Sequence, residues 1–402
     1  MQKNRVMIIG AGLGGLVLAH GLSSRGLDVA VYERDSYPGE RPQGYRIQLG
    51  EPGLAGLQHC LPPHLFELSL ATAGSPPPRV TVRNRQLEML SDPATSAQSR
   101  SAGATSPRSF NRATLREILL SGLGENVNYG AQLLSYRQEE DGTVTAEFAD
   151  GRVATADLLV GADGVGSTVR KFLLPDAEVK DAGLRLIYGR IPLDAETSEL
   201  LPAWVFESIF SVVTAGPGQP HVGIGPVQFD QRPDLAGLAT NPPVRVTAVD
   251  DYLAFMVGAP ADHPAMPSVG ALRQLDYQSL YGVAEKLVDD NWHPEIRQLL
   301  ALWEKESLLA LRVSTAAPVP VWEPSRVTLI GDAIHAMSPV LAMGANTAIR
   351  DASELTRALS DAVASQGSLV GAISGYQNRM AEYASVLVAD SRRTGQARVG
   401  QA

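Results

Sequence analysis

Short apolar runs alternate with glycine-rich turns at the start of the chain. The runs at Arg5–Ile9 and Asp28–Glu33 are mainly apolar and β-branched, which predicts two buried strands. Between them, Gly10–Gly15 predicts a glycine turn, and Leu16–Arg25 predicts a helix that ends at Gly26. Strand, turn, helix and strand in this order are typical of the opening of a Rossmann-type sheet.

The next part of the chain mixes extended, helical and loop patterns. Residues 91–109 are rich in Ser, Ala, Thr and Pro and show little periodicity, which predicts an exposed loop. Asn111 is a suitable N-cap for an amphipathic helix that extends to about Leu123. The dipeptide Asp141-Gly142 predicts a hairpin turn. The remaining predictions are an extended segment at Gly39–Leu49, helices at Pro52–Cys60 and Pro63–Ala71, and strands at Leu133–Gln138, Val144–Phe148 and Ala156–Val160.

From about residue 182 to residue 258, strand patterns separated by Pro/Gly-rich turns predominate. These strands predict an antiparallel sheet that is inserted into an α/β domain. Helical periodicity returns afterwards, and a short buried strand precedes the last two helices. The predicted strands are Gly183–Ile191, Val205–Ala215, Val222–Phe229, Tyr252–Gly258 and Arg326–Ile330, and the predicted helices are Ala271–Asp290, His293–Trp303, Thr347–Ala364 and Leu369–Gly395.

Composition narrows the class of protein. The chain has 402 residues, of which 44% are hydrophobic and 19% charged, so it can bury a sizeable core. Its net charge of −9 argues against nucleic acid or an anionic membrane surface as a partner. The single cysteine, Cys60, excludes an intrachain disulfide and fits a cytoplasmic location, and no metal site is expected. The apolar stretch Val6–Ala19 is too short to span a membrane.

The glycine turn predicts a nucleotide site. In the pattern Gly10-x-Gly12-x-x-Gly15, the first glycine allows a tight turn, the second lets a pyrophosphate approach the backbone, and the third permits close packing of helix and strand. The start of the following helix stabilises phosphate charge. Glu33 ends the second strand and can accept both ribose hydroxyls of an adenosine. A carboxylate there repels a 2′-phosphate, which favours FAD or NAD over NADP.

Two later segments also place polar residues at the ends of predicted buried strands, where open α/β sheets bind ligands. The first contains Asp163-Gly164 and is also explained as a strand-to-helix turn with Ser167 as N-cap. The second contains Gly331-Asp332, followed by a helix start at Met343–Asn346 that can stabilise negative charge on a ligand. His335 lies between them and is interpreted as a structural histidine more readily than as a ligand contact.

These three segments, in this order, resemble the class A flavin-dependent monooxygenases, the family of para-hydroxybenzoate hydroxylase, and the resemblance covers essentially the whole chain. It implies an α/β fold with a Rossmann-like FAD-binding domain (residues 1–75, 100–180 and 271–402, including the C-terminal helices). It further implies an inserted antiparallel-sheet substrate domain (residues 76–99 and 181–270). The FAD contacts that it implies are Gly10, Gly12, Leu13, Gly14 and Gly15 at the pyrophosphate, Glu33 at the adenosine ribose with Arg34 next to it, Leu133 at the adenine, Arg112 near the phosphates and ribityl chain, Arg41 and Arg46 as positions for a further arginine near the cofactor, Asp163 for both FAD and NAD(P)H, Asp332 at the ribityl chain, and Gly344, Ala345 and Asn346 at the isoalloxazine.

The resemblance implies hydroxylation or epoxidation of a bulky aromatic or polycyclic small molecule. NADPH or NADH transiently reduces FAD, and O₂ forms a flavin C4a-hydroperoxide that transfers oxygen; such relatives often belong to natural-product biosynthesis. Tyr45, Arg46 and Gln48 are catalytic candidates on the strand that passes the flavin, and strand alternation places Tyr45 on the opposite face from the other two. Pairing with neighbouring strands explains the three residues equally well. Pro339 is expected on the substrate side of the flavin, and the candidate substrate contacts are Phe206, Phe210, His221 and Phe229, with sheet core as the alternative.

One departure from the family pattern leaves other functions open. Ala342 stands where the family usually has glycine, so the backbone there or the approach of the flavin is expected to differ. A flavin oxidase or reductase on the same fold, and a non-catalytic FAD- or ligand-binding relative, are therefore alternatives. The sequence does not distinguish NADH from NADPH or a monomer from a homodimer.

Overall fold

The computed structural model describes residues 4–40, 45–91, 106–319 and 322–401. Its centre is a parallel sheet in the order β18-β12-β1-β2-β8. The predicted β1–turn–α1–β2 unit is confirmed, and α1 begins three residues earlier than expected. The elements of this unit and sheet are β1 (Arg5–Ile9), α1 (Leu13–Ser23), β2 (Asp28–Tyr32), β8 (Val127–Asn128), β12 (Leu158–Gly161) and β18 (Val327–Leu329).

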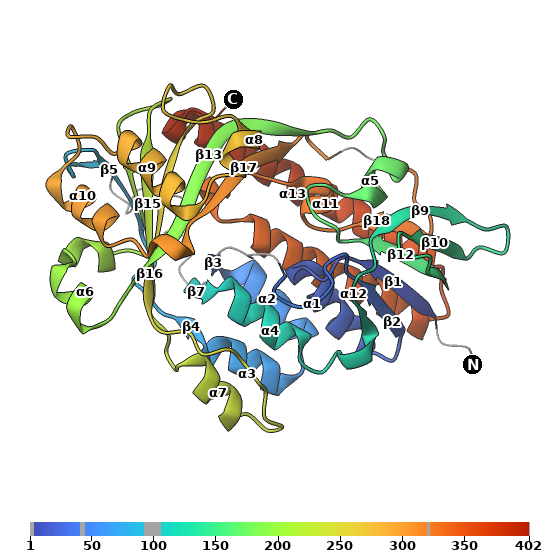
Figure 1. The fold of residues 1–402 in the computed structure, drawn as a ribbon. Coiled ribbons are helices and arrows are strands. Elements are labelled where there is room, and N and C mark those ends of the chain that lie inside the picture. Colours follow the sequence, from blue (N-terminus) through green and yellow to red (C-terminus); the bar gives the residue numbers. More distant parts are fainter. Residues whose placement is uncertain (1–3, 41–44, 92–105, 320–321, 402) are drawn as a thin grey trace.

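Long helices pack beside this sheet and share its hydrophobic core. The helix α12 (Gly344–Ala364) contacts α1, α2 (Glu51–Cys60) and α13 (Leu369–Val399). In Figure 1, α12 and α13 extend from the parallel sheet towards a second, larger sheet, and the C-terminus lies beside that larger sheet. None of the helices in the described ranges is long and apolar enough to cross a membrane.

Two small antiparallel sheets flank the parallel one. The predicted hairpin is confirmed as β9 (Leu133–Gln138) and β10 (Val144–Phe148), and β11 (Val153–Ala156) extends it. The other sheet has the order β3 (Arg46–Leu49), β7 (Arg108–Asn111), β4 (Ala73–Gly74). Most of the predicted loop at 91–109 lies outside the described residues, but its end belongs to β7, because this segment pairs with β3.

The larger sheet has seven strands in the order β17-β13-β16-β15-β14-β5-β6. The predicted antiparallel insertion is therefore present, with three strands that we did not predict. They are β17 (Leu309–Ala316), which pairs with β13, and β5 and β6 at the other edge, where β5 runs parallel to β14. The predicted strand at 205–215 begins only at Phe210, because a short 3-10 helix, Ala203–Phe206, precedes it. The other strands are β5 (Val80–Asn84), β6 (Met89–Ser91), β13 (Val179–Pro192), β14 (Phe210–Thr214), β15 (His221–Val227) and β16 (Tyr252–Pro260).

The two faces of this sheet have different surroundings. One face, which we call the core face, carries Val222 and Ile224 of β15 and Phe255 and Val257 of β16. These residues form one hydrophobic cluster with side chains of α8 (Val269–Leu272), α9 (Tyr277–Leu287) and α10 (Pro294–Ala301). The helices α9 and α10 therefore pack with the large sheet, although they follow residue 271, where we predicted that the FAD-binding domain resumes; the domain bounds stay a prediction.

The opposite face carries residues that alternate with those of the core face. We call it the glycine face and define it by His221, Gly223 and Gly225 of β15 and Met256 and Gly258 of β16. The remaining helical elements are α3 (Pro63–Ala71), α4 (Arg112–Leu120), α5 (Thr168–Leu173), α6 (Ala195–Leu200), α7 (Pro233–Ala239), α11 (Asp332–His335) and the 3-10 helices Gly124–Asn126, Lys305–Ser307 and Pro339–Leu341.

Candidate functional site

The turn between β1 and α1 has the geometry of a phosphate cradle. Gly10 has a φ of +107°, and a Cβ there would lie 2.4 Å from the carbonyl oxygen of Ala162, so a side chain cannot be accommodated. A Cβ on Gly15 would lie 2.2 Å from the carbonyl oxygen of Gly10, which explains the close contact of helix and strand. Around Gly12, by contrast, a Cβ would meet no described atom within 4 Å. Leu13 and Gly14 begin α1, so unpaired N–H groups of the helix face this open position.

Glu33 lies directly beside this turn. Its side chain is buried; Oε2 accepts a hydrogen bond from Ala11 N at 2.8 Å and Oε1 accepts one from Asp35 N at 3.0 Å. Arg116 Nε donates to Ala11 O at 3.0 Å, which fixes the turn from the other side. Arg116 was not predicted, although its place one turn after Arg112 on the same helix is a usable signal.

The other residues predicted near the adenosine do not form side-chain hydrogen bonds to the glycine turn among the described residues. Arg34 is exposed next to Glu33. The side chain of Leu133 is buried in the hydrophobic core, and Ala131 N donates to Glu33 O at 2.8 Å, which brings this segment beside the Glu33 backbone. Arg41 lies outside the described residues.

Two residues predicted at the ribityl chain, Arg112 and Asp332, and one predicted at the isoalloxazine, Gly344, converge from separate segments. Arg112 begins α4, and its backbone N donates to Tyr45 O at 2.8 Å. Burial lowers the pKa of Arg112, and the nearby carboxylate of Asp332 opposes that shift. A Cβ on Gly344 would lie 3.9 Å from Asp332 Oδ1, so the start of α12 is also close. Among described residues the Arg112 guanidinium has no hydrogen bond or ion pair, which fits a site that an anionic group completes.

Asn346 at the start of α12 holds neighbouring segments together. Its Oδ1 accepts from Gly50 N at 2.8 Å, and its Nδ2 donates to Gln48 O and to Ala342 O, both at 2.9 Å. Because the side-chain amide makes these protein contacts, Asn346 positions the strand end and the loop. The backbone N–H groups of Gly344 and Ala345, in the first turn of α12, remain the groups suited to negative charge.

The Asp163 carboxylate caps α5. Its Oδ1 accepts from Ser167 Oγ at 2.5 Å and its Oδ2 accepts from Thr168 N at 2.7 Å. Burial raises the pKa of Asp163, and these donors oppose that shift. Ser167 Oγ accepts from Arg170 N at 2.9 Å, so the N-cap interpretation of Ser167 is confirmed. The hydrogen bonds of Asp163 thus lie within its own turn, and a nucleotide role for it stays a prediction.

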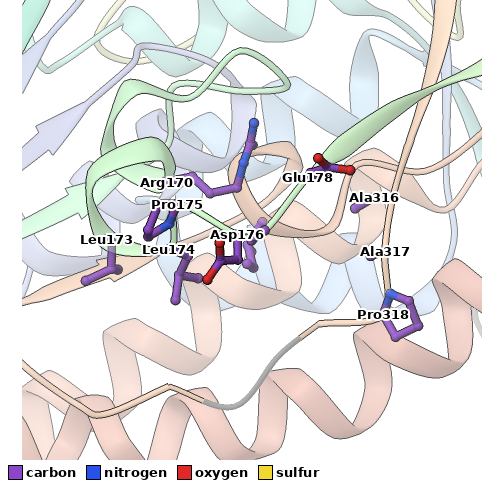
Figure 2. Close-up of a pocket in the computed structure, with 11 residues that line it drawn as sticks. Arg170, Leu173, Leu174, Pro175, Asp176, Glu178, Ala316, Ala317 and Pro318 are labelled. Carbon is purple, nitrogen blue, oxygen red and sulfur yellow. The ribbon is translucent and has the colours of Figure 1, made fainter.

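Figure 2 shows a pocket below this turn, between α5, the start of β13 and the end of β17. Arg170 contributes to its wall and donates to Ala333 O at 2.7 Å and Val165 O at 2.9 Å, which joins the turn of Asp163 to that of Asp332. Of the residues predicted for flavin or substrate, none that the structure describes lines this pocket. It is therefore separate from the candidate site.

The catalytic candidates lie where β3 approaches the glycine face. The hydroxyl of Tyr45 donates to Ser307 O. Arg46 Nε donates to Ser109 Oγ at 3.1 Å, and its guanidinium lies over the ring of Phe210, 5.4 Å from the ring centroid. Gln48 is partly buried, and its backbone oxygen accepts the bond from Asn346 described above. The structure thus brings Arg46 and Phe210 together.

The other predicted substrate contacts are spread out. His221 is buried on the glycine face, its Nδ1 has no partner among described residues, and burial lowers its pKa to about 4. Phe229 packs edge-on against Tyr252, 6.5 Å between ring centroids. Phe206 packs against the cluster of the core face. Phe206 is only partly buried there, so its packing favours the sheet-core alternative, and a substrate contact for it stays a prediction.

The loop before α12 approaches the glycine face. Pro339 begins a 3-10 helix and is exposed, and the next residue, Val340, packs with the cluster that contains Leu186 and Met256. Ala342 ends this turn in the left-handed conformation, with a φ of +53° and a ψ of +28°. The residue that replaces the family glycine thus adopts the backbone that favours glycine.

A buried polar network behind this loop was missed in the sequence. His335 Nε2 lies 2.6 Å from Asp351 Oδ2, which also accepts from Gly331 N at 2.7 Å. Tyr383 Oη donates to Asp351 Oδ1 at 2.6 Å. Burial is the largest single influence and opposes protonation of His335, but the charge and hydrogen bond of Asp351 together with the charge of Asp332 outweigh it, and the pKa of His335 is raised. His335 is therefore a positioning residue beneath the Gly331-Asp332 turn.

Two known domain families match the two stretches of the chain that supply most of the candidate FAD site. The NAD(P)-binding Rossmann-like domain matches residues 8–73, and the FAD binding domain matches residues 303–389. A crystal structure from Photorhabdus luminescens, assigned as a FAD-containing monooxygenase, superposes with a TM-score of 0.82, 30% identity and coverage of 99% of both chains. The aurachin C monooxygenase/isomerase of Stigmatella aurantiaca is 28% identical over 402 residues, covering 98% of this chain and 89% of its own.

A longer relative matches over a part of its length. The dual O-methyltransferase/FAD-dependent monooxygenase CTB3 of Cercospora beticola is 31% identical over 369 residues, which is 88% of this chain. This chain therefore spans 42% of that relative.

Proposed function

Because the chain belongs to the para-hydroxybenzoate hydroxylase-like family of FAD-dependent monooxygenases, we propose that it uses NADPH or NADH and O₂ to hydroxylate or epoxidise a bulky aromatic or polycyclic molecule. In hydroxylation, a substrate C–H, O₂, NAD(P)H and a proton give the alcohol, NAD(P)⁺ and water. One oxygen atom enters the substrate and the other leaves as water. The observation that carries the proposal is the convergence of Arg112, Asp332 and Gly344 beside the apolar glycine face.

The residues around the open turn fit FAD. Glu33 is placed to accept the ribose hydroxyls, the N–H groups near Gly12 to bind the pyrophosphate, and Arg112 to neutralise phosphate charge. Asp332 would accept from the ribityl hydroxyls. When bound, FAD supplies the redox chemistry, taking electrons from NAD(P)H and delivering them to O₂.

Two further parts of the site would act on the bound cofactor: one stabilises its negative charge, and the other keeps water away from the reacting atoms. The first turn of α12 would stabilise negative charge on the reduced cofactor through the N–H groups of Gly344 and Ala345. Val340 and Met256 present apolar surface that limits access of water to the reacting atoms. No histidine or carboxylate among the described residues touches the Arg46–Phe210 pair, so we assign no general base.

The apolar glycine face supports a bulky substrate. Several of its side chains, or neighbours on adjacent strands, remain partly exposed in the protein without ligand: Phe210, Val212, Met256, Leu309 and Leu311. A flat apolar molecule would cover them. The relative from Stigmatella aurantiaca is named for aurachin C, and we extend from it only the class, a biosynthetic small molecule.

The test is anaerobic reduction of the FAD-loaded protein. We expect NADPH or NADH to bleach the flavin absorbance, and a substrate to accelerate the bleaching. On admission of O₂, a product heavier by one oxygen atom should appear, labelled when ¹⁸O₂ is used. Bleaching by substrate alone, with hydrogen peroxide as the end product, would indicate an oxidase instead, and bound flavin that no condition reduces would indicate a non-catalytic binder.

A further inference from the structure

Arg46 carries a partly buried positive charge whose hydrogen-bond acceptors are all neutral. Its Nε donates to Ser109 Oγ at 3.1 Å and its Nη2 donates to Ile209 O at 2.6 Å. No carboxylate forms an ion pair with it among the residues that the structure describes. Burial lowers the pKa of Arg46, and the groups that oppose this shift are tyrosines, Tyr188 and Tyr252. Removing a cation from water in part, without an anionic partner, carries a desolvation cost, so a purely structural role does not explain why an arginine stands here.

The guanidinium is nevertheless held in one orientation. It lies over the Phe210 ring on one side. On another side it lies against Gly225 of β15, where a Cβ would be only 2.7 Å from Arg46 Nε. The backbone N of Arg46 donates to Tyr188 Oη at 2.9 Å. A glycine at 225 thus makes room for the arginine, and Nη1, which has no acceptor among described residues, is pre-oriented to donate.

The surroundings of Arg46 are apolar and partly exposed. Phe210 lies against Arg46, and Met256 and Val212 lie beside Phe210 around Gly223. Each of these three side chains remains partly accessible to solvent. Arg190 of β13, by contrast, is neutralised by an ion pair with Glu304. A ligand that covers this surface therefore meets apolar side chains and one uncompensated positive charge.

Arg46 is also close to the segments that we assign to the flavin. Two residues further along β3, Gln48 O is bound to Asn346 at the start of α12. One residue earlier, Tyr45 O accepts from the backbone of Arg112. The strand that carries Arg46 therefore connects the glycine face to both the ribityl and the isoalloxazine ends of the cofactor site.

We propose that Arg46 binds an anionic group of the substrate, and that the substrate is a planar aromatic molecule whose one acidic group is ionised at neutral pH. The proposal rests on the function proposed above, since it places this molecule at the flavin. The anion would neutralise the arginine in surroundings of low dielectric, where such a pair is stronger than in water. The planar ring would cover the exposed apolar side chains of the glycine face. Arg46 is then a substrate-binding residue rather than a base, which its guanidinium cannot be.

A matched pair of probes tests the charge requirement. The FAD-loaded protein is titrated with 1-naphthoate and with 1-naphthamide, which have the same ring system and nearly the same shape but differ in charge. Binding is followed by calorimetry and by the change in flavin absorbance. We expect the wild type to bind naphthoate at least about tenfold more tightly, within the range of one charge-assisted hydrogen bond. Arg46→Met should abolish the difference, and Arg46→Lys should retain part of it.

Arg83→Met is the matched control. Arg83 also lies 5.4 Å from an aromatic centroid, that of Trp204, but it faces the carboxylate of Glu207 at 3.8 Å. Its removal should leave the preference for naphthoate unchanged. FAD affinity and thermal unfolding, measured for each variant, show that the variants are folded.

Three results would overturn the proposal: equal affinities of the wild type for both probes, no saturable binding of either, or a preference that persists in Arg46→Met. Reduction by NAD(P)H is measured separately on the same samples. A naphthoate preference without any flavin reduction would contradict the proposed function and leave the anion site in place. Flavin reduction without a preference for naphthoate would contradict the anion site at Arg46 and leave the proposed function in place.

Discussion

The two faces of the seven-stranded sheet are built by the same strands but are suited to different tasks. On β15, Val222 and Ile224 join the cluster of the core face, while the alternating residues Gly223 and Gly225 receive side chains from elsewhere on the other face. The core face is closed by α9 and α10, and its large side chains include Phe255, which packs edge-on with Trp303 at 5.1 Å between ring centroids. The glycine face remains partly exposed and holds an unpaired arginine.

This difference separates stability from recognition. On the core face, side chains are buried against one another, and the stabilisation comes from removing apolar area from water. On the glycine face, the backbone itself forms the surface on which Arg46, Phe210 and Met256 lie. Substitutions on the first face should therefore change the free energy of unfolding, and substitutions on the second should change ligand binding.

Ile224→Ala is expected to have the largest effect on stability. Ile224 is fully buried on the core face, and its truncation leaves a cavity between the sheet and its helices. We expect the free energy of unfolding to fall by about 2–5 kcal/mol, measured by urea denaturation of the FAD-loaded protein. The ratio of naphthoate to naphthamide affinity should not change in the folded variant. A large change in this ratio with little loss of stability would contradict the separation of the two faces.

His221 lies on the glycine face, and its burial there can be tested by the pH dependence of the free energy of unfolding. Burial lowers its pKa to about 4 in the folded protein, against roughly 6.5 when unfolded. The unfolded chain therefore binds more protons between these values, and folding stability falls as the pH decreases from about 6.5 towards 4. The contribution lost amounts to up to about 3 kcal/mol.

The measurement for His221 is the difference between wild type and His221→Gln in the free energy of unfolding, at pH 7.5 and at pH 5. The wild type should lose more stability than the variant over this range, because glutamine does not titrate. Equal losses in both proteins would mean that His221 is not buried in its neutral form.

The sequence predicted the parallel sheet better than the faces of the large sheet. The glycine turn, Glu33 and Asp332 are local signals, since each lies at the end of a predicted strand. Arg112 was indicated only by the family resemblance. The assignment of side chains to the two faces of β15 depends on register against β14 and β16, which come from distant parts of the chain. The strand β17 was missed for a related reason, because it joins the sheet through β13, from which it is far away in the sequence.

Contacts across long sequence separations were also not predictable. His335 meets Asp351 and Tyr383 only because α11, α12 and α13 pack together, so the sequence gives no indication that this histidine has a carboxylate partner. The arginine at 46 was recognised as a candidate, but its unpaired charge and its fit over Gly225 depend on the fold.

Gly225→Ala is expected to have an intermediate effect on stability and a selective effect on binding. The added Cβ would lie 2.7 Å from Arg46 Nε and 3.0 Å from its Cδ, so the guanidinium must move. We expect a loss of about 1–3 kcal/mol in the free energy of unfolding, and loss of the preference for naphthoate over naphthamide in the titration described above.

Gly258→Ala is the control on the same face. Its Cβ would lie 2.5 Å from His221 Nε2 and from Leu186 Cδ2, so the crowding is comparable but falls on other side chains. The naphthoate preference should survive in this variant. If both variants lose it equally, the effect is general disturbance of the sheet rather than displacement of Arg46.

Ala342→Gly is expected to have the smallest effect, and the effect has the opposite sign. Ala342 holds a φ of +53° in the turn between the Pro339 loop and α12, and its carbonyl accepts the bond from Asn346 Nδ2. A non-glycine residue in the left-handed region is strained by roughly 1–2 kcal/mol, part of which glycine loses again through its greater freedom in the unfolded chain. We therefore expect the free energy of unfolding to rise by about 1 kcal/mol or less. The preference for naphthoate over naphthamide should not change, because the loop contacts the glycine face through Val340 and not through Arg46. A decrease in stability in urea denaturation would show that the Cβ of Ala342 contributes packing that outweighs its backbone strain, and the alanine would then be a stabilising replacement for the family glycine.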